Sequence, residues 1–182
     1  MSDRTSMISG FLHAAGWEAA ARTLVAGDAS NRRYERLTRT NGDTVILMDA
    51  PADKGEDVRP FIDVTHALRA VGLSAPDIRA KDEDAGLLLI EDLGDALFAR
   101  VMEDDPALEK PLYEASVDVL LHLHREPPPD LPHYDAVIMT DRASLAFDWY
   151  QRGALGGIDI KAQTRFQKAM AGCLAPLQSV TP

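Results

Sequence analysis

Five arginines gather in one stretch of an otherwise acidic sequence, and such a group could bind an anion. Residues 22–39 hold five arginines and two acids, a net charge of +3, whereas the 182-residue chain has a net charge of −10 at pH 7. The arginines are Arg22, Arg32, Arg33, Arg36 and Arg39. A local cluster of this kind favours a small anionic ligand over a charged polymer. In the alternative interpretation, the arginines lie on a solvated strand face and pair with nearby acids.

A cluster of turn-forming residues, 27–31, precedes two of these arginines. Small residues let backbone N–H groups approach phosphate oxygens, and arginine adds a planar two-pronged donor. The candidate phosphate contacts are Ser30, Asn31, Arg32 and Arg33. The segment matches neither the G-x-G-x-x-G nor the Walker A pattern, and an ordinary Asp-Ala-Ser turn is the competing interpretation.

A second group of residues has the chemistry to bind a sugar. Trp149 offers an aromatic face to the C–H surface of a sugar ring, and the Asp148 carboxylate can bind its hydroxyls. His133 can add a polar contact to the same pocket. The competing interpretations, which we favour from the sequence alone, are that Trp149 packs in a helical core and that His133 anchors a loop. We predict no catalytic residue and no metal ligand in the sequence.

Composition excludes several classes of protein. The net charge of −10 argues against a basic nucleic-acid binder, whose affinity would depend on neutralising phosphates. The single cysteine, Cys173, cannot form an internal disulfide. No apolar run approaches the roughly 18 residues that span a bilayer. We therefore expect a cytoplasmic protein that has neither a nucleic-acid nor a membrane partner.

Hydrophobic patterning predicts the elements that position these residues in the first half of the chain. Asn41-Gly42 between two β-prone runs is a strong hairpin signal, because both residues tolerate positive φ. The apolar spacing after Pro60 is that of a helix with one buried face. The predicted elements are a helix at 4–15, strands at 23–26, 34–39 and 44–48, a helix at 60–71, and strands at 76–81 and 87–91.

The character of the sequence changes after Gly94, where only helices are predicted. A long helix covers residues 108–125 and ends before three prolines. Shorter helices cover 144–150, capped by Asp141 or Ser144, and 159–177. The prediction is thus a β-rich domain at residues 1–93 joined to a helical segment at 94–182.

Several motifs, taken together, resemble one family. Residues 86–95 resemble the hinge strand of aminoglycoside-phosphotransferase-type kinases; their sequence is Gly-Leu-Leu-Leu-Ile-Glu-Asp-Leu-Gly-Asp. A buried strand that ends in a glycine turn would show the same pattern. With residues 45–51, 72–76 and 147–150, residues 86–95 resemble the branch that contains the cytoplasmic anomeric kinases of N-acetylmuramate and N-acetylglucosamine, which serve cell-wall recycling in Gram-negative bacteria. The resemblance extends from about residue 20 to 182 and covers only the N-terminal half of such a kinase.

The resemblance implies a fold, a reaction and two cofactors. The fold is α+β and protein-kinase-like: an N-terminal antiparallel sheet lobe with one packed helix, followed by the start of a helical C-lobe. ATP, with Mg²⁺, would phosphorylate the anomeric hydroxyl of an amino sugar. The nucleotide would contact Ser30, Asn31, Arg32 and Arg33 through its phosphates, and its adenine would pair with the Glu91 carbonyl and the Leu93 N–H.

Two departures from the family pattern change what we expect. Kinase-like folds usually carry a phosphate-binding lysine on the third strand, where this sequence has Met48, most simply a core side chain. The catalytic aspartate loop and the metal-binding aspartate are not found in residues 1–182, so Mg²⁺ ligands are expected beyond residue 182. We therefore predict that this chain alone is inactive, and that it self-associates through exposed helical faces such as that of Phe166, Met170 and Leu174.

Two alternatives stay open from the sequence. The chain could be a non-catalytic nucleotide- or partner-binding module of the same fold, which the missing lysine and catalytic loop favour. It could also belong to a kinase-like transferase with another small alcohol substrate, such as choline, homoserine or an aminoglycoside.

Overall fold

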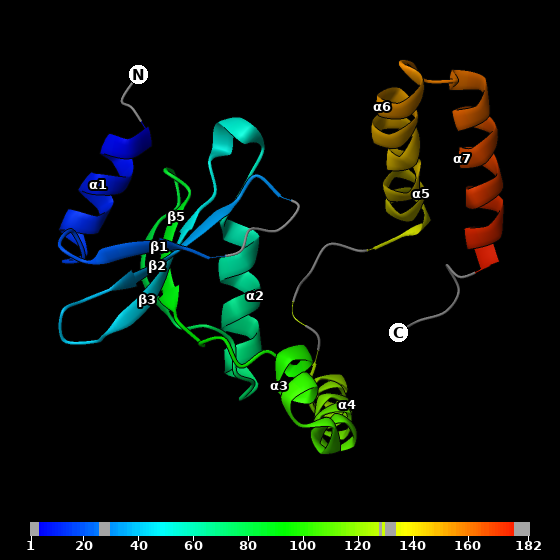
Figure 1. The fold of residues 1–182 in the computed structure, drawn as a ribbon. Coiled ribbons are helices and arrows are strands. Elements are labelled where there is room, and N and C mark those ends of the chain that lie inside the picture. Colours follow the sequence, from blue (N-terminus) through cyan, green and yellow to red (C-terminus); the bar gives the residue numbers. More distant parts are fainter. Residues whose placement is uncertain (1–3, 26–29, 128, 130–133, 177–182) are drawn as a thin grey trace. The chain divides into compact units, whose positions relative to one another are not determined.

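A computed structural model describes residues 4–25, 30–127, 129 and 134–176. The chain falls into two compact units, Met1–Pro128 and Pro129–Pro182, and each is described by itself. Figure 1 shows the sheet with its helices and the separate helical unit. This division falls after Pro128, whereas we predicted a boundary between two lobes at residues 93 and 94. The predicted lobe boundary stays a prediction.

The first unit contains one five-stranded sheet in which every neighbouring pair is antiparallel. The strands, in their order across the sheet, are β1 (Ala21–Leu24), β2 (Arg33–Thr38), β3 (Thr44–Asp49), β5 (Leu87–Glu91) and β4 (Ile78–Asp82). The predicted hairpin joins β2 to β3, and Gly42 has a φ of +92° there. β1 begins two residues earlier than predicted. The α+β fold class is confirmed.

Helices cover both faces of this sheet, as Figure 1 shows. Side chains alternate between the two faces of a strand, so successive apolar residues of β3 enter different cores. Leu47 lies in the core beneath α1 (Arg4–Ala14), whose Ile8 and Leu12 are buried against the sheet. Met48 lies in the core beneath α2 (Arg59–Ala70), with Ile62 of that helix. Both helices were predicted, and α1 adds a second packed helix to the predicted one.

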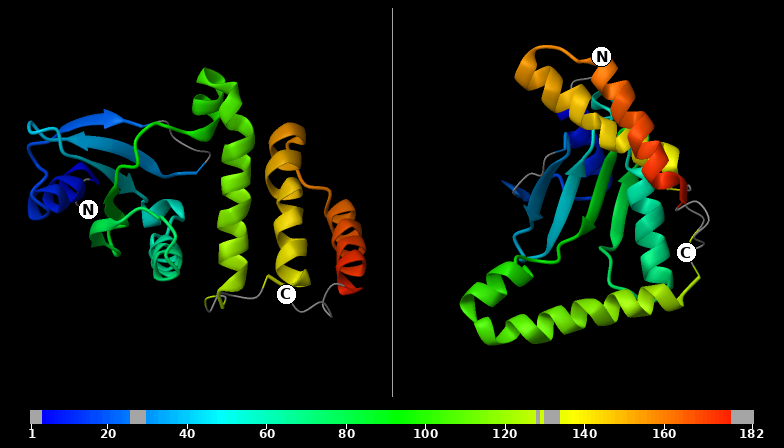
Figure 2. Two further views of the ribbon diagram at one scale, coloured as in Figure 1. Left: turned by 90° about the horizontal axis from the view of Figure 1, so that it is seen from below. Right: turned by 90° about the vertical axis from the view of Figure 1, so that its right-hand side faces the viewer.

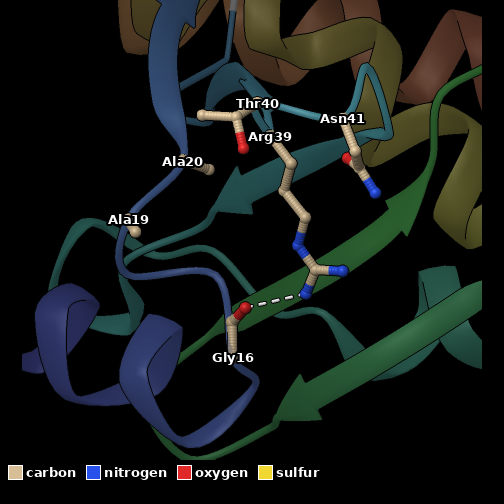
Figure 3. Close-up of a pocket in the computed structure, with 6 residues that line it drawn as sticks. All are labelled: Gly16, Ala19, Ala20, Arg39, Thr40 and Asn41. Atoms are coloured by element: carbon tan, nitrogen blue, oxygen red, sulfur yellow. Dashed lines mark hydrogen bonds between the residues drawn. The ribbon is translucent and has the colours of Figure 1, made fainter.

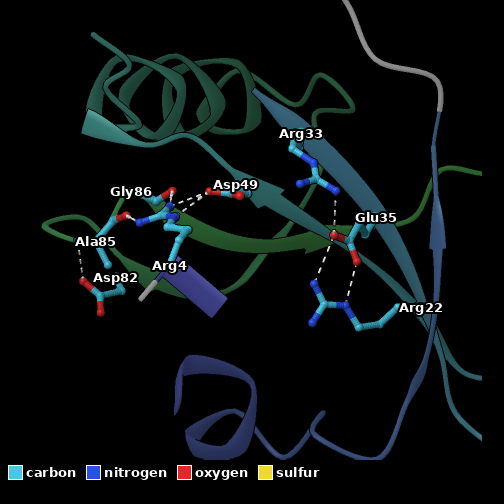
Figure 4. Close-up of polar contacts among 8 residues, drawn as sticks. All are labelled: Arg4, Arg22, Arg33, Glu35, Asp49, Asp82, Ala85 and Gly86. Carbon is cyan, nitrogen blue, oxygen red and sulfur yellow. Dashed lines mark hydrogen bonds and ion pairs between the residues drawn. The ribbon is translucent and has the colours of Figure 1, made fainter. Parts of the chain in front are cut away.

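The backbone at Gly86, just before β5, passes very close to the backbone at Ala50, just after β3. Gly86 has a φ of +66°, and an added Cβ would lie 2.1 Å from the Ala50 carbonyl oxygen. Arg4 of α1 lies over this point, as Figure 4 shows, and donates to the Asp49 carboxylate at 2.5 Å and to the Ala85 carbonyl at 2.6 Å. The N-terminal helix is therefore tied to two strand ends by one guanidinium.

Three helical segments complete the first unit after the sheet. They are α3 (Phe98–Asp104), the 3-10 turn η2 (Pro106–Leu108) and α4 (Glu109–Arg125). α4 was predicted, whereas α3 was not, because it is short and none of its residues is buried. Figure 2 shows α4 as the long helix across one end of the sheet. Its His122 Nε2 lies 2.7 Å from the carbonyl oxygen of Val71, directly after α2.

The second unit is helical. It contains α5 (Ala136–Leu145), the π-helical turn η3 (Ala146–Gln151), α6 (Arg152–Leu155) and α7 (Ile160–Leu174). The predicted start near residue 144 was wrong: Asp135 caps α5 by accepting from the N–H groups of Val137 and Ile138. Asp159 caps α7 as the predicted boundary requires. Phe147 packs on Phe166 with ring centroids 5.4 Å apart.

Candidate functional site

The face of the sheet that carries α2 is only partly covered. Met48 and Leu88 are fully buried there, whereas Tyr34 and Ile46 are half-buried. Met48 is thus a core side chain, as predicted. This face therefore offers a small apolar surface beside the end of β5 where the predicted hinge begins.

The lysine of kinase-like folds usually pairs with a glutamate of the helix on this face. Here the third strand has Met48, and the buried residues of α2 are Ile62 and Thr65. Neither Met48 nor these two buried residues of α2 carries a charge.

The described end of the phosphate-loop candidate is held by one carboxylate. Glu56 accepts from the Asn31 backbone N–H at 3.0 Å and from Arg32 Nε at 2.8 Å. This hydrogen bond raises the pKa of Arg32, because it stabilises the charged guanidinium. Ser30 Oγ accepts from the Arg32 N–H at 3.2 Å. The structure thus brings Ser30, Asn31 and Arg32 together, and the Glu56 carboxylate occupies the donors of the last two.

Arg33 points elsewhere. Its side chain is 64% exposed, and its nearest acid is Glu35, at 3.8 Å. Glu35 is already held by Arg22 through hydrogen bonds of 2.6 Å and 3.0 Å, which Figure 4 shows, and these lower the pKa of Glu35. Arg32 and Arg33 are the two predicted phosphate contacts that form ion pairs, and Arg33 has the more exposed side chain.

Each arginine of the predicted cluster contacts an acid, which is what the alternative interpretation expects. Arg39 lies 3.9 Å from Asp43, covers the Trp17 ring at 3.8 Å and donates to the Gly16 carbonyl at 2.7 Å. Figure 3 shows Arg39 lining a shallow pocket with Gly16, Ala19, Ala20, Thr40 and Asn41. This pocket lies between the α1–β1 loop and the β2–β3 hairpin, and none of the predicted site residues lines it.

The predicted hinge follows β5. The Glu91 N–H donates to the Asp77 carbonyl at 2.8 Å, and the Glu91 carboxylate accepts from the Asp77 N–H at 3.0 Å. Leu93 is 60% exposed. Among the described residues, none accepts a hydrogen bond from the Leu93 N–H. This N–H can therefore donate to a ligand.

Sequence reasoning missed the strongest polar contact near the hinge. Arg36 of β2 donates to the two carboxylate oxygens of Asp92 at 2.7 Å and 3.0 Å, and to those of Asp95 at 2.8 Å and 3.1 Å. The pKa values of both aspartates are lowered by this guanidinium, and the pKa of Arg36 is raised. The arginine cluster was the only signal of this contact, because the sequence does not show which acids its arginines meet.

The sugar-binding candidates lie in the second unit. Asp148 and Trp149 belong to η3, and π-helical turns often occur at functional sites. Trp149 is 76% exposed, so our preference for a helical core position was wrong. His133 lies outside the described residues.

No group of three or more candidate metal ligands occurs among the residues that the structure describes. The acidic run at residues 103–105 lies at the end of α3, and Asp105 accepts from the Ala107 N–H. Within the same described ranges, no helix is both long and apolar enough to cross a bilayer.

Comparison with known proteins places this site in a family. The model of the phosphotransferase enzyme family matches residues 22–177, which include β2, β3 and β5. The chain belongs to this family. Three relatives bear the name N-acetylmuramate/N-acetylglucosamine kinase. The chain is 37% identical to the one from Caulobacter vibrioides, 34% to the one from Pseudomonas putida and 31% to the one from Neisseria meningitidis.

These matches cover most of the chain but less than half of each relative. They include 74%, 76% and 85% of this chain, and 44%, 40% and 47% of the relatives in the same order. The chain thus spans about half the length of the curated relatives that it matches. The predicted resemblance to such kinases is confirmed, and the matches cover less than half of each relative.

Proposed function

We propose that this chain supplies the nucleotide-binding portion of an ATP-dependent kinase that phosphorylates the anomeric hydroxyl of N-acetylmuramate or N-acetylglucosamine. The observation that carries the proposal is the repeated match to relatives of that name over about three quarters or more of the chain. The anomeric oxygen attacks the γ-phosphorus of ATP, the bond from that phosphorus to the β-bridging oxygen breaks, and ADP leaves. The products are a sugar 1-phosphate, ADP and the proton released from the anomeric hydroxyl.

The residues at the hinge fit an adenine base. The exposed Leu93 N–H has no acceptor among the described residues, and the half-buried Tyr34 and Ile46 offer an apolar surface on the neighbouring sheet face. Adenine presents both a flat apolar face and a hydrogen-bonding edge. We infer that the base lies against this surface, with its edge at Leu93 and the Glu91 carbonyl.

The phosphates would lie toward the opposite end of the sheet. Arg33 pairs in register with Asp49, at the end of β3 remote from the hinge. With Met48 in place of a lysine, we expect Arg32 and Arg33 to hold the phosphates. Mg²⁺, when bound, offsets the charge on the phosphates. The residues that the structure describes include no group of three or more candidate metal ligands, and we expect the Mg²⁺ ligands and the catalytic aspartate beyond residue 182.

The sugar would contact the second unit. Trp149 is exposed on η3 beside Asp148, so an aromatic face and a carboxylate are both accessible to a ligand. His133 completes the set of proposed sugar contacts.

Calorimetric titration of the 182-residue chain with Mg-ATP tests the nucleotide site, and hydrogen exchange at Leu93 locates it. We expect binding and slower exchange of the Leu93 amide. Absence of both on a folded sample would refute the nucleotide site. Sugar 1-phosphate formation by the protein expressed from its complete reading frame tests the reaction. Nucleotide binding without any sugar phosphate would instead favour the non-catalytic module.

A further inference from the structure

Arg36 connects two parts of the first unit that are not neighbours in the sheet. It pairs in register with Ile46 of β3, which pairs in turn with Ile90 of β5. Neighbouring strands lie about 4.8 Å apart, so β2 and β5 are separated by roughly 10 Å. Arg36 reaches across β3 and binds the side chains of Asp92 and Asp95. We call these three residues the Arg36 clasp.

The clasp helps to fix the chain directly after β5. Residues 93–98 are all exposed, so burial of apolar side chains does not hold them. The side chain of Asp92, by contrast, is only 6% exposed and accepts from the Gly94 N–H at 3.0 Å as well as from Arg36. Leu93 therefore lies between Asp92 and Gly94, and the Asp92 carboxylate fixes both neighbours through its hydrogen bonds.

The four hydrogen bonds of the clasp use both carboxylates and three guanidinium nitrogens. A bidentate arginine fixes the orientation of a carboxylate as well as its position. The direction of the Leu93 N–H thus depends on a residue of β2 that lies 57 positions earlier in the sequence.

We propose that Arg36 is a positioning residue for the nucleotide: through Asp92 and Asp95 it aims the Leu93 N–H at the adenine base. This inference rests on the proposed function and extends it. Because the clasp acts at the hinge and the phosphate contacts lie at the other end of the sheet, loss of Arg36 should weaken binding of the base and leave binding of the phosphates unchanged.

The test uses the 182-residue chain and three ligands: Mg-ATP, adenosine and Mg-tripolyphosphate. Arg36→Gln should weaken the calorimetric affinity for Mg-ATP and for adenosine by about tenfold, the loss expected when a directed hydrogen bond is misaligned. Its affinity for Mg-tripolyphosphate should stay within about twofold of the wild type. Arg36→Lys should fall between wild type and Arg36→Gln, because one ammonium cannot hold both carboxylates bidentately.

Arg22→Gln is the matched control. Arg22 makes a bidentate pair with Glu35 on the same sheet but has no contact with the residues after β5. All three affinities of this variant should stay within about twofold of the wild type. Should Arg36→Gln fail to fold, Asp95→Asn keeps the Arg36–Asp92 pair and should still weaken adenosine more than tripolyphosphate.

The outcomes separate the two proposals. A wild-type chain that binds neither Mg-ATP nor adenosine overturns the proposed nucleotide site, and the positioning role with it. A wild-type chain that binds both, with Arg36→Gln indistinguishable from Arg22→Gln, overturns the positioning role alone. Equal losses for adenosine and tripolyphosphate would also overturn it, since they indicate a general loss of structure.

Discussion

Replacing Gly86 by alanine should destabilise the first unit by about 3 kcal/mol. The added Cβ would lie 2.1 Å from the Ala50 carbonyl oxygen, a backbone atom that cannot rotate away. The left-handed φ of +66° costs about 1 kcal/mol for any residue with a Cβ. Relief of the overlap separates the two segments and breaks the 2.9 Å bond from the Ala50 N–H to the Gly86 carbonyl. It also disturbs the bond from Arg4 to the Ala85 carbonyl, and each loss costs about 1 kcal/mol.

Gly42→Ala is the control, because Gly42 has a φ of +92° but nothing within 4 Å of an added Cβ. It should cost only the backbone strain, about 1 kcal/mol. Urea unfolding followed by Trp17 fluorescence measures both variants in a Trp149→Phe background. Trp17 then reports on the first unit alone, since the chain has two tryptophans and Trp149 belongs to the second. Equal destabilisation by the two alanines would refute the steric argument.

Three further predictions concern the arginines. Changing Arg32 and Arg33 together to alanine, in the protein expressed from its complete reading frame, should lower kcat/KM for ATP by about tenfold or more, because two charge-assisted bonds to phosphate are lost. An unchanged kcat/KM would leave both as surface residues. Glu56→Gln should strengthen binding of Mg-tripolyphosphate a few-fold, roughly, by releasing Arg32 from a competing carboxylate; equal or weaker binding contradicts this competition. Finally, Arg22 lowers the pKa of Glu35 in the folded chain. Their ion pair therefore stabilises the fold at a pH above 4.5, the ordinary pKa of a glutamate. This stabilisation is lost as the pH falls through the lower pKa that Glu35 has in the folded state. The urea midpoints of wild type and Arg22→Gln should therefore differ at neutral pH and converge in acid, and a constant difference would refute the linkage.

The sequence by itself determined the elements whose signals are local. Asn41-Gly42 predicted the β2–β3 hairpin because a tight turn needs a residue that tolerates positive φ, and Gly42 has a φ of +92° there. Met48 was expected in the core because it follows a run of β-branched and aliphatic residues, and it is fully buried. The helix at α2 followed from apolar spacing over a few turns. α3 gave no such signal, since a short exposed helix needs no apolar face.

Only the tertiary structure decided which charges meet and which surfaces are covered. Arg36 and Asp92 are 56 residues apart, and they meet because β2 and β5 both pair with β3 in a particular register. Gly86 reads as an ordinary turn glycine until Ala50 is placed against it. Trp149 looked like a core residue, yet it is exposed on η3. Hydrophobic periodicity reports how a residue relates to its own helix or strand, whereas ion pairs, close approaches and exposure depend on how distant segments pack together.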